Sequence, residues 1–420
     1  MSSSNEKEVM GIKIPKGWKV VKLKDICKKL KAGGTPSTSR KEFWNGNIPF
    51  VKIEDISSAE KYLTKTLTTI SEEGLKNSAA WVVPKNSLLF AMYGSLGEVA
   101  ITKIEVATNQ AILGIIPNKD IDVEFLYYWF LYFKPYWKKY AKPTTQANLT
   151  AEIVKNTKLP YPSEEERKTI VEILSTVDKA IQKVDEAIEK TERLKKGLMQ
   201  RLLTKGIGHK EFKYSKELGC EIPKEWKVVR LKDICIINPE QIDPRIQMPN
   251  RIFLYIDISS VEEGRIKEHK EILGKNAPVR ARRVIHKNDV IMSTVRPYLK
   301  AFALVPEQYD GQICSTGFAV LRCNQNKINS YYLLYTLLSD KTIDQCKAMM
   351  VGGQYPALNQ SQVENLKIPL PPLKEQQKIA EILSTVDKKL ELEKKRKEKF
   401  ERIKKGLMEV LLSGKVGVRV

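Results

Sequence analysis

Hydroxyl and basic side chains gather in a loop near the N-terminus, where residues 31–41 read KAGGTPSTSRK. Serine and threonine hydroxyls donate hydrogen bonds, and arginine and lysine carry positive charge, so this composition suits contacts with phosphate groups. Glycine lacks a Cβ atom and would let the loop approach another backbone closely. An ordinary turn closed by Pro36 explains the same residues equally well. The candidate binding residues of this loop are Gly33, Gly34, Thr35, Ser37, Arg40 and Lys41.

A second group of candidates lies in the other half of the chain, in the segment STVRPYLK at residues 293–300. Arg296 precedes Pro297 at the end of an apolar run, where we expect its planar guanidinium to be held at a strand edge. Arginine is the commonest bidentate reader of guanine, and it clamps phosphate equally often. The candidates here are Ser293, Thr294, Arg296, Tyr298 and Lys300.

Two further loops, each shortly before a long helical segment, contain a glutamine. The amide of glutamine can pair with the edge of adenine, although a glutamine in a loop is more often simply solvated. The candidates are Thr145 and Gln146 in the first half of the chain and Gly353, Gln354 and Tyr355 in the second.

The sequence lacks the motifs of catalytic chemistry that could act on such a ligand. No GxxxxGK[ST] loop is present, so the phosphate-binding loop of an ATPase is missing. The six cysteines contain no CxxC pair and the three histidines no HxxxH spacing, which argues against a structural zinc site. We therefore expect no catalytic residue and no bound metal, and we expect the cysteines to be reduced thiols.

The charge of the chain favours a polyanionic partner. Its 72 Lys and Arg residues against 50 Asp and Glu residues leave a formal net charge of +22, with a pI near 9.5. Each cation placed against a phosphate releases condensed counterions, so such an excess favours nucleic acid. A lysine-rich proteome or a membrane-surface protein would show the same excess.

The length of 420 residues suits two domains of moderate size plus connecting elements. The most apolar run, FLYYWFLYF at residues 125–133, is far shorter than the ~20 residues of a membrane span. We expect this run to be a buried helix. The polar N-terminal segment lacks the apolar core of a secretory signal, so we expect a cytoplasmic protein without membrane association.

An internal repeat covers most of the sequence. Residues 14–27 read IPKGWKVVKLKDIC and return as IPKEWKVVRLKDIC at 222–235, and EILSTVDK at 172–179 returns unchanged at 381–388. Between these blocks, residues 28–140 and 236–350 share only a loose likeness. This contrast indicates a common scaffold that carries two different binding regions, and the repeated Trp18 and Trp226 are expected to be core anchors.

Each repeat ends in a segment with the spacing of a long helix. Ser163 followed by Glu166 fits a capping box, and apolar residues then recur every three or four positions. A helix of about 40 residues is ~60 Å long, and its narrow apolar stripe must be buried against another element. We expect the two helices to pair with each other and rank packing of each helix on its own domain well below this. The partner-binding positions expected on the helices are Ile170, Leu174, Val177, Ile181, Ile379, Leu383, Val386 and Leu390.

These patterns predict an α+β protein in which two mixed α/β domains are joined by two long helices that form an antiparallel coiled coil. The expected boundaries are 1–162 for the first domain, 163–208 for the first helix, 209–370 for the second domain and 371–420 for the second helix. Apolar strands are expected near residues 48–56, 87–93, 252–258 and 289–295. A non-catalytic coiled-coil adaptor whose domains bind protein would share this plan, and the polar loops would then be a coincidence.

The motifs resemble those of the specificity subunits of type I restriction-modification enzymes. The segment KAGGTPSTSRKEFWNGNIPFVKIEDI at 31–56 resembles the opening motif of the family's recognition domain. HKNDVIMSTVRPYLKAFALV at 286–305 resembles the other common variant of that domain. KLPYPSEEERKTIVEIL and KIPLPPLKEQQKIAEIL match the helix signature that the family carries twice, and the resemblance covers essentially the whole chain after the first ten residues.

The resemblance implies two target-recognition domains, each of which reads one half of a split double-stranded DNA target, with the helices fixing the half-site separation. It also implies two methyltransferase subunits that use S-adenosylmethionine, and ATP-driven restriction subunits. Neither cofactor is expected on this chain, which would be a non-catalytic subunit. The specificity subunit of a related enzyme that cuts both sides of its site is an alternative, and an enzyme acting alone is the least favoured.

Overall fold

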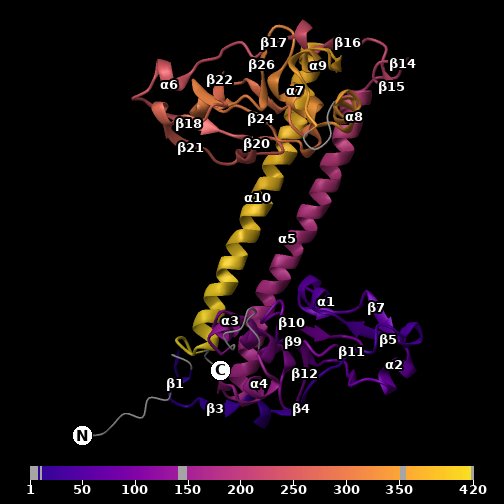
Figure 1. Ribbon diagram of the computed structural model, residues 1–420, viewed down its shortest axis with the longest axis vertical. Coiled ribbons are helices and arrows are strands. Elements are labelled where there is room, and N and C mark those ends of the chain that lie inside the picture. The colour runs from indigo at the N-terminus through magenta and orange to yellow at the C-terminus, as the bar shows by residue number, and fades with distance from the viewer. Residues whose placement is uncertain (1–7, 10–11, 141–148, 351–355, 418–420) are drawn as a thin grey trace. The chain divides into compact units, whose positions relative to one another are not determined.

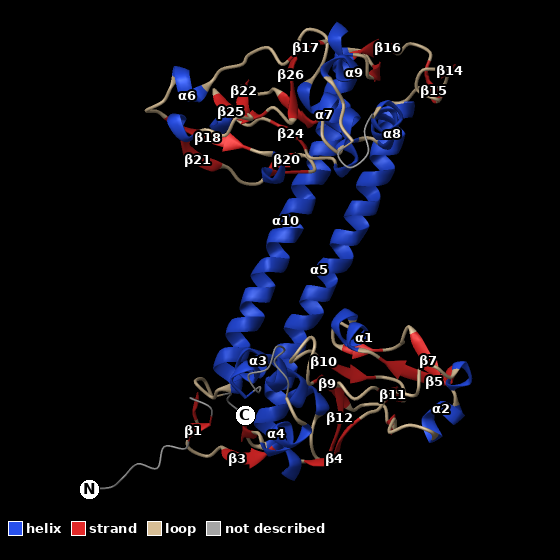
Figure 2. Cartoon of the chain, in the orientation of Figure 1, coloured by secondary structure: helices blue, strands red, loops and turns tan. Residues whose placement is uncertain are grey.

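A computed structural model describes residues 8–9, 12–140, 149–350 and 356–417 (Figure 1). Backbone contacts divide the chain into two units, which we describe separately. Unit 1 comprises Met1–Asp185 and Lys395–Val420, and unit 2 comprises Glu186–Lys394. In each unit, a part built of sheets and short helices adjoins segments of the two long helices (Figure 2). We call these parts head 1 (residues 8–162) and head 2 (residues 209–370).

Head 1 is built on two larger sheets, a five-stranded sheet with the order β4-β12-β9-β10-β6 and a four-stranded sheet with the order β7-β5-β11-β8. A small third sheet pairs β13 with β3 in antiparallel register. The strands are β1 (Glu8–Val9), β2 (Ile12–Lys13), β3 (Lys19–Lys22), β4 (Cys27–Ala32), β5 (Trp44–Val51), β6 (Tyr62–Leu63), β7 (Thr68–Ile70), β8 (Val82–Val83), β9 (Leu88–Ala91), β10 (Val99–Thr102), β11 (Val106–Thr108), β12 (Ile112–Pro117) and β13 (Lys158–Tyr161).

The short helices of head 1 are α1 (Ile53–Ser58), α2 (Glu72–Lys76), α3 (Val123–Tyr140) and α4 (Ala151–Asn156). Both α1 and α3 contact β9 and β10, which explains why every residue of these two strands is buried. The apolar run at 125–133 lies in α3, and Trp129 is only 1% exposed. The prediction of a buried helix there is confirmed.

The strand expected at 48–56 is only partly correct, because β5 ends at Val51 and α1 begins at Ile53. The buried carboxylate of Asp55 accepts hydrogen bonds from the backbone amides of Lys52, at 2.8 Å, and Leu67, at 3.1 Å. An acidic residue that satisfies free amides at the start of a helix stabilises it, and apolar spacing alone does not reveal this.

Head 2 repeats the plan of head 1. Its sheets have the orders β17-β26-β23-β24 and β21-β18-β25-β22, and β16 pairs with β27. The strands are β14 (Phe212–Ser215), β15 (Cys220–Pro223), β16 (Lys227–Arg230), β17 (Cys235–Ile237), β18 (Ile252–Ile256), β19 (Val261–Glu262), β20 (Arg265–Ile266), β21 (Lys270–Leu273), β22 (Ala281–Ile285), β23 (Val290–Ser293), β24 (Phe302–Leu304), β25 (Gln312–Ser315), β26 (Phe318–Cys323) and β27 (Lys367–Leu370). The short helices are α6 (Pro244–Gln247), α7 (Ser330–Leu338), α8 (Asp340–Met349) and α9 (Gln360–Glu364). The shared strand order shows that the repeat extends through the regions where the two sequences are only loosely alike.

The two long helices are α5 (Glu164–Lys205) and α10 (Leu373–Leu412). The capping box of α5 is confirmed, because the Ser163 amide donates to the Glu166 carboxylate at 2.9 Å and the Ser163 hydroxyl accepts from the Glu166 amide at 3.3 Å. The indole of Trp18 donates to the same Glu166 carboxylate at 3.1 Å, and Trp226 makes the equivalent bond to Glu375 at 3.0 Å. The repeated tryptophans are therefore core anchors that also hold the helix starts.

In each unit the core of the head includes residues of both long helices. In unit 1, Ile170 and Leu174 at the start of α5 belong to the same apolar cluster as Leu411 and Leu412 at the end of α10. The equivalent cluster of unit 2 contains Ile379 and Leu383 from α10 together with Leu202 and Leu203 from α5. This corrects the expectation that the apolar stripe serves helix pairing alone, because the ends of both helices pack on the heads.

Between these anchored ends, ion pairs align the two helices in opposite directions. In unit 1, Lys404 contacts Asp178 at 2.6 Å and Lys397 contacts Asp185 at 2.7 Å. In unit 2, Lys394 contacts Glu192 at 3.2 Å and Lys195 contacts Asp387 at 2.7 Å. Within each unit, a later position on α5 meets an earlier one on α10, so the prediction of antiparallel helices is confirmed.

All six cysteines are free thiols. Within the described ranges, no group of three or more His, Cys, Asp or Glu residues is arranged to hold a metal ion. In the same part of the chain, none of the helices combines the length and apolarity that crossing a membrane requires.

The packing of α10 on head 2 predicts a difference between two leucines of one helix. Leu383 is fully buried in the head 2 core and Leu392 is 66% exposed. Leu383→Ala should lower the free energy of unfolding by about 2–5 kcal/mol, because it removes buried methyl groups and leaves a cavity. Leu392→Ala, the matched control, should change it by less than about 0.5 kcal/mol. Urea unfolding of both variants measures this, and equal effects would contradict the shared core.

Candidate nucleic-acid interface

Several loops of head 1 meet at one edge of its five-stranded sheet. The backbone amide of Gly33 donates to Ile112 at 3.2 Å and that of Gly34 donates to Thr108 at 2.9 Å. The Thr35 hydroxyl donates to the side-chain oxygen of Gln110 at 2.6 Å. These contacts join the loop at 33–41 to the turn between β11 and β12.

Contacts within the chain itself require glycine at both of these positions. A Cβ atom on Gly33 would overlap the carbonyl of Thr108, and one on Gly34 would lie 2.6 Å from the Cβ of Ala79. Both glycines are buried. Their close approach is therefore to this chain's own backbone, which corrects the reason we gave for them, and their assignment to DNA binding stays a prediction.

The remaining candidates of the loop are exposed and held by local contacts. The Trp44 indole donates to the Ser37 carbonyl at 3.1 Å, and the Arg40 guanidinium lies over the ring of Phe43 at 5.5 Å. Arg40 also lies 4.0 Å from Glu42, and with more than half of each side chain exposed this pair contributes little to stability. Thr35, Ser37, Arg40 and Lys41 thus present donors and charge at the surface of a loop whose backbone is fixed.

A loop that the sequence did not single out lies at the same edge. The Met92 amide donates to Ala111 at 2.8 Å, and the Leu149 amide donates to Met92 at 3.0 Å. The loop at 93–97, which follows β9, is thereby placed beside the β11–β12 turn and beside Leu149. The candidates Thr145 and Gln146 lie outside the described residues.

Head 2 brings its loops together in the same way. The Thr294 amide donates to Gly317 at 2.8 Å, and the Leu358 amide donates to Thr294 at 2.9 Å, as Leu149 does to Met92 in head 1. The Arg296 amide donates to Pro356 at 3.0 Å. The loop at 294–300 therefore lies beside the chain that follows Gly353, Gln354 and Tyr355, which are outside the described residues. In the sequence, the loop at 93–97 could have been found by aligning it with the candidate loop at 294–300.

Two of the head 2 candidates use their hydroxyls to shape the loop. Ser293 is 1% exposed and donates to the carbonyl of Val295 at 2.7 Å, and the Thr294 hydroxyl donates to the carbonyl of Gly317 at 2.9 Å. The Ser293 hydroxyl donor is thus used within its own loop, and the assignment of Ser293 to DNA binding stays a prediction.

Arg296 lies in a loop beyond the end of β23. We had expected its guanidinium to be held at a strand edge. Its backbone is left-handed, with φ 48° and ψ 54°, although a residue that precedes proline strongly prefers an extended backbone. Such a conformation costs about 1–3 kcal/mol and persists only where the surroundings hold it. The 3-10 turn at Pro297–Leu299 follows, and it leaves Tyr298 39% exposed. Lys300, which is also left-handed at φ 55°, ends the turn and contacts Asp340 at 3.3 Å.

Three arginines in the segment RARR at residues 280–283, which leads into β22, adjoin this edge and were missed in the sequence. The carbonyl of Arg280 accepts from the Thr316 amide at 2.8 Å, next to the residue that holds Thr294. Arg282 contacts Asp243 at 2.7 Å, and Arg245 contacts the same carboxylate at 3.0 Å. The hydrogen bond from Arg245, together with both positive charges, lowers the pKa of Asp243 to about 2.

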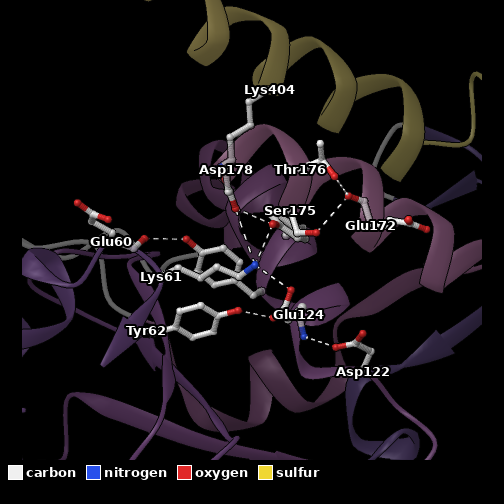
Figure 3. A network of polar contacts seen from close by, with 12 residues as sticks. Glu60, Lys61, Tyr62, Asp122, Glu124, Glu172, Ser175, Thr176, Asp178 and Lys404 are labelled. Atoms are coloured by element: carbon white, nitrogen blue, oxygen red, sulfur yellow. Dashed lines mark hydrogen bonds and ion pairs between the residues drawn. The ribbon is translucent and has the colours of Figure 1, made fainter. Parts of the chain in front are cut away.

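In unit 1, a polar network joins head 1 to both long helices (Figure 3). The Lys61 ammonium lies 2.8 Å from Glu124 and 3.8 Å from Asp178. The Tyr128 hydroxyl donates to Asp178 at 2.6 Å, and the other oxygen of this carboxylate contacts Lys404 of α10 at 2.6 Å. Asp178 thus connects α3, α5 and α10 through charge-assisted hydrogen bonds, which are stronger than neutral ones.

The centre of this network recurs in unit 2. There the Tyr335 hydroxyl donates to Asp387 at 2.7 Å, and Lys195 contacts the same carboxylate at 2.7 Å. The aspartates belong to the repeated block EILSTVDK, and the lysines to the blocks RLKKGLM and RIKKGLM. The network therefore gives a structural role to the repeated aspartates and lysines, which the apolar spacing of the helices did not explain.

Lys61 also determines the charge state of Glu124. Partial burial by itself raises the pKa of this carboxyl group, but hydrogen bonds from Lys61 and Tyr62 outweigh it and hold the pKa below its ordinary value. Burial and the bond to Asp178 raise the pKa of Tyr128, which keeps its hydroxyl protonated as the donor. The network is thus built for an ionised carboxylate and a neutral phenol.

Comparison with known proteins agrees with this architecture. The family model described as the type I restriction modification DNA specificity domain matches residues 15–192 and again residues 223–402. The chain therefore belongs to this family, whose domain it carries twice, and it is a specificity subunit of a type I restriction-modification system.

Two relatives from Methanocaldococcus jannaschii match nearly the whole chain. The putative type I restriction enzyme MjaX specificity subunit is 31% identical over 424 residues, which cover 97% of this chain and 95% of the relative. The type I restriction enzyme MjaVIII specificity subunit is 29% identical over 428 residues, with 99% and 96% covered.

Two solved structures share the fold. The S subunit of a type I restriction-modification system from M. genitalium aligns with a TM-score of 0.56 and 16% identity, over 95% of this chain and 96% of that one. A chain from a study of complex assembly and conformational transition of the type I restriction-modification system aligns with a TM-score of 0.60 and 19% identity, over 96% and 100%.

The lowered pKa of Glu124 predicts a stability that depends on pH. A carboxyl group with a depressed native pKa stabilises the fold above its ordinary range near ~4.3, and this contribution is lost as the pH falls through the native pKa. Glu124→Gln should therefore lower the melting temperature at pH 7, and its difference from the unmodified chain should shrink from pH 5 to pH 3. Circular dichroism melts measure this, with Glu105→Gln, an exposed glutamate of the same head, as the control. A difference that stays constant with pH would contradict the ion pair.

Proposed function

We propose that head 1 and head 2 each read one half of a bipartite double-stranded DNA target. The observation that carries this proposal is the common arrangement of the loops. In both heads, the loop after the strand β9 or β23 is bonded to the turn before β12 or β26 and to the chain leading to the long helix. The scaffold is the same while the loop sequences differ, as expected for two domains that read different half-sites. Phosphate contacts would position each head and a few side chains would read base edges.

The role proposed for α5 and α10 is to fix the separation between the half-sites. An α-helix rises about 1.5 Å per residue and is stiff over its length, so its number of turns determines a distance. The packing of helix ends into the cores of the heads supports this role, because a helix that could slide against its head would not set a distance.

Two methyltransferase subunits are the partners we propose for the helices and heads. Unit 1 contains a groove of about 1040 Å³ whose lining includes Tyr127, Ile181 and Met408. Unit 2 contains a groove of about 900 Å³ whose lining includes Met199, Leu338 and Leu390. Ile181 and Leu390 are equivalent positions of the repeat, so two copies of one partner would find similar surfaces. Ile170, Leu174, Ile379 and Leu383 are buried in the heads, which restricts the partner-binding prediction to Val177, Ile181, Val386 and Leu390.

Catalysis is assigned to those partners in this proposal. An adenine must leave the base stack and enter a pocket before it is methylated. S-adenosylmethionine and ATP would be bound by the methyltransferase and restriction subunits, and this chain would supply recognition without a cofactor of its own.

An exchange of heads tests the proposal. Replacing residues 28–140 with the same region of a family member of different specificity should change only one half of the methylated sequence. N6-methyladenine mapped in DNA from cells that also express the methyltransferase subunit measures this, with the unmodified chain as control. Changes in both halves of the site, or in neither, would contradict the assignment of one half-site to each head.

Arg296→Ala tests which part of the DNA the strained loop of head 2 contacts. If Arg296 reads a base, binding to the recognised site should weaken by about 1–3 kcal/mol, while binding to random DNA changes little. Fluorescence anisotropy on both DNAs measures this, and an equal loss on the two would assign Arg296 to a phosphate.

A further inference from the structure

Arg283 has an unusual environment on β22 of head 2. The strand pairs with β25 in antiparallel register, and the register shifts between Ala281 and Arg283. An irregularity of this kind changes the direction of the side chains beside it and is common next to functional sites. Arg283 pairs with Cys314, which is fully buried, and its own side chain is half-buried.

The guanidinium group of Arg283 lacks acceptors for two of its nitrogen atoms. Nε and Nη1 each expose less than 1 Å², and within the described ranges neither has a hydrogen-bond partner. A buried donor without an acceptor is costly, and more so when it carries a charge. Burial also lowers the pKa of this arginine, in agreement with a poorly solvated cation.

Two carboxylates in segments that contact or follow β22 are paired with other arginines. Arg282, the preceding residue, contacts Asp243 at 2.7 Å and donates to the Val279 carbonyl at 2.9 Å. Arg322 donates to both oxygens of Asp289, at 3.1 and 3.0 Å. The missing acceptor is therefore one that the protein does not supply from these neighbouring carboxylates.

We infer that Arg283 contacts a DNA phosphate in head 2, an inference that rests on the proposed function of this head. Because Nε and Nη1 are covered in the free chain, their contact with the phosphate requires the segments over them to shift when DNA binds. A phosphate offers the anionic oxygens that a guanidinium binds in a bidentate manner. Phosphates form the outer surface of DNA, so they can approach a recessed side chain that is unable to enter a groove and reach the base edges. Arg280, which directly precedes β22, adds positive charge, and its carbonyl is bonded to the turn that holds Thr294.

Head 1 carries a different residue at this position. Asn86 in head 1 and Asn288 in head 2 are equivalent turn residues, both left-handed, with φ 60° and 68°. Counting back from them, the position of Arg283 in head 2 corresponds to that of Trp81 in head 1. Trp81 is 9% exposed, and Lys29 lies over its ring at 4.1 Å. The contact that we infer therefore belongs to head 2 alone.

The test compares Arg283→Met with a matched control in the full chain bound to its methyltransferase subunits. Methionine keeps much of the volume and removes the charged donors. We expect affinity to fall by a similar factor, about 3- to 30-fold, on the recognised site and on random DNA, and the slope of log K against log salt to become shallower by about 1. The melting temperature of the free chain should stay unchanged or rise, because a buried donor without an acceptor is removed.

Arg265→Met is the matched control, because it removes the same charge from head 2 at an exposed arginine that contacts Glu262 at 3.0 Å. It should leave the affinity and the salt slope close to those of the unmodified complex. Arg283→Gln, which loses the charge but keeps polar atoms, should show the same loss of affinity and serves if the methionine variant does not fold.

Three results would overturn the inference. Unchanged affinity and slope would mean that Arg283 does not touch DNA, and a loss confined to the recognised site would make it a base reader. A lowered melting temperature with unchanged binding would make it a structural residue. Failure of the unmodified complex to prefer its methylated site over random DNA would instead refute the proposed function, so the two failures are distinguishable.

Discussion

The joint between each head and the two long helices is the constraint on which the recognition loops depend. At this joint the start of one helix and the end of the other complete the apolar core of the head, as Leu174 and Leu411 do in unit 1. Core residues are closely packed, so a helix anchored in this way cannot rotate or slide without opening a cavity. One aspartate on the helix then connects the head to both helices, Asp178 in unit 1 and Asp387 in unit 2. This joint therefore fixes the position, relative to the helices, of the loops that we propose to bind DNA.

The positively charged side chains of this chain serve two purposes, since some stabilise the fold and others are available to bind DNA. Many lysines and arginines of this basic chain are paired, and Lys61, Lys404 and Lys195 contact carboxylates inside the joints. These cations stabilise the arrangement of head and helices and have little left to offer a phosphate. Arg40, Lys41 and Arg283 differ, because they are exposed or lack acceptors for buried donors. The net charge thus indicates only that a polyanion is favoured as a partner. The ion pairs within the chain indicate which cationic side chains remain to contact it.

The two heads show how one scaffold can carry two binding surfaces. Apart from β6, which extends the larger sheet of head 1, their strand orders match, and equivalent backbone bonds hold the loops after β9 and β23. The side chains at the edge differ, since head 1 presents the loop at 33–41 and buries Trp81 where head 2 has Arg283. Backbone hydrogen bonds within the sheet do not depend on side-chain identity, so the loop residues can vary without loss of the fold.

The sequence alone was sufficient for the repeat, the two long helices and their antiparallel pairing, because these follow from local spacing and from near-identical blocks. It also identified the capping box at Ser163 and the buried helix around Trp129. The tertiary structure decided what the loop residues do. Gly33 packs against Thr108, the Thr294 hydroxyl bonds to Gly317, and Arg283 has two buried donors without an acceptor. Each of these facts depends on residues distant in the chain. Spacing along a sequence reports which face of an element is apolar, whereas the partner of a polar side chain is determined only when separate segments come together.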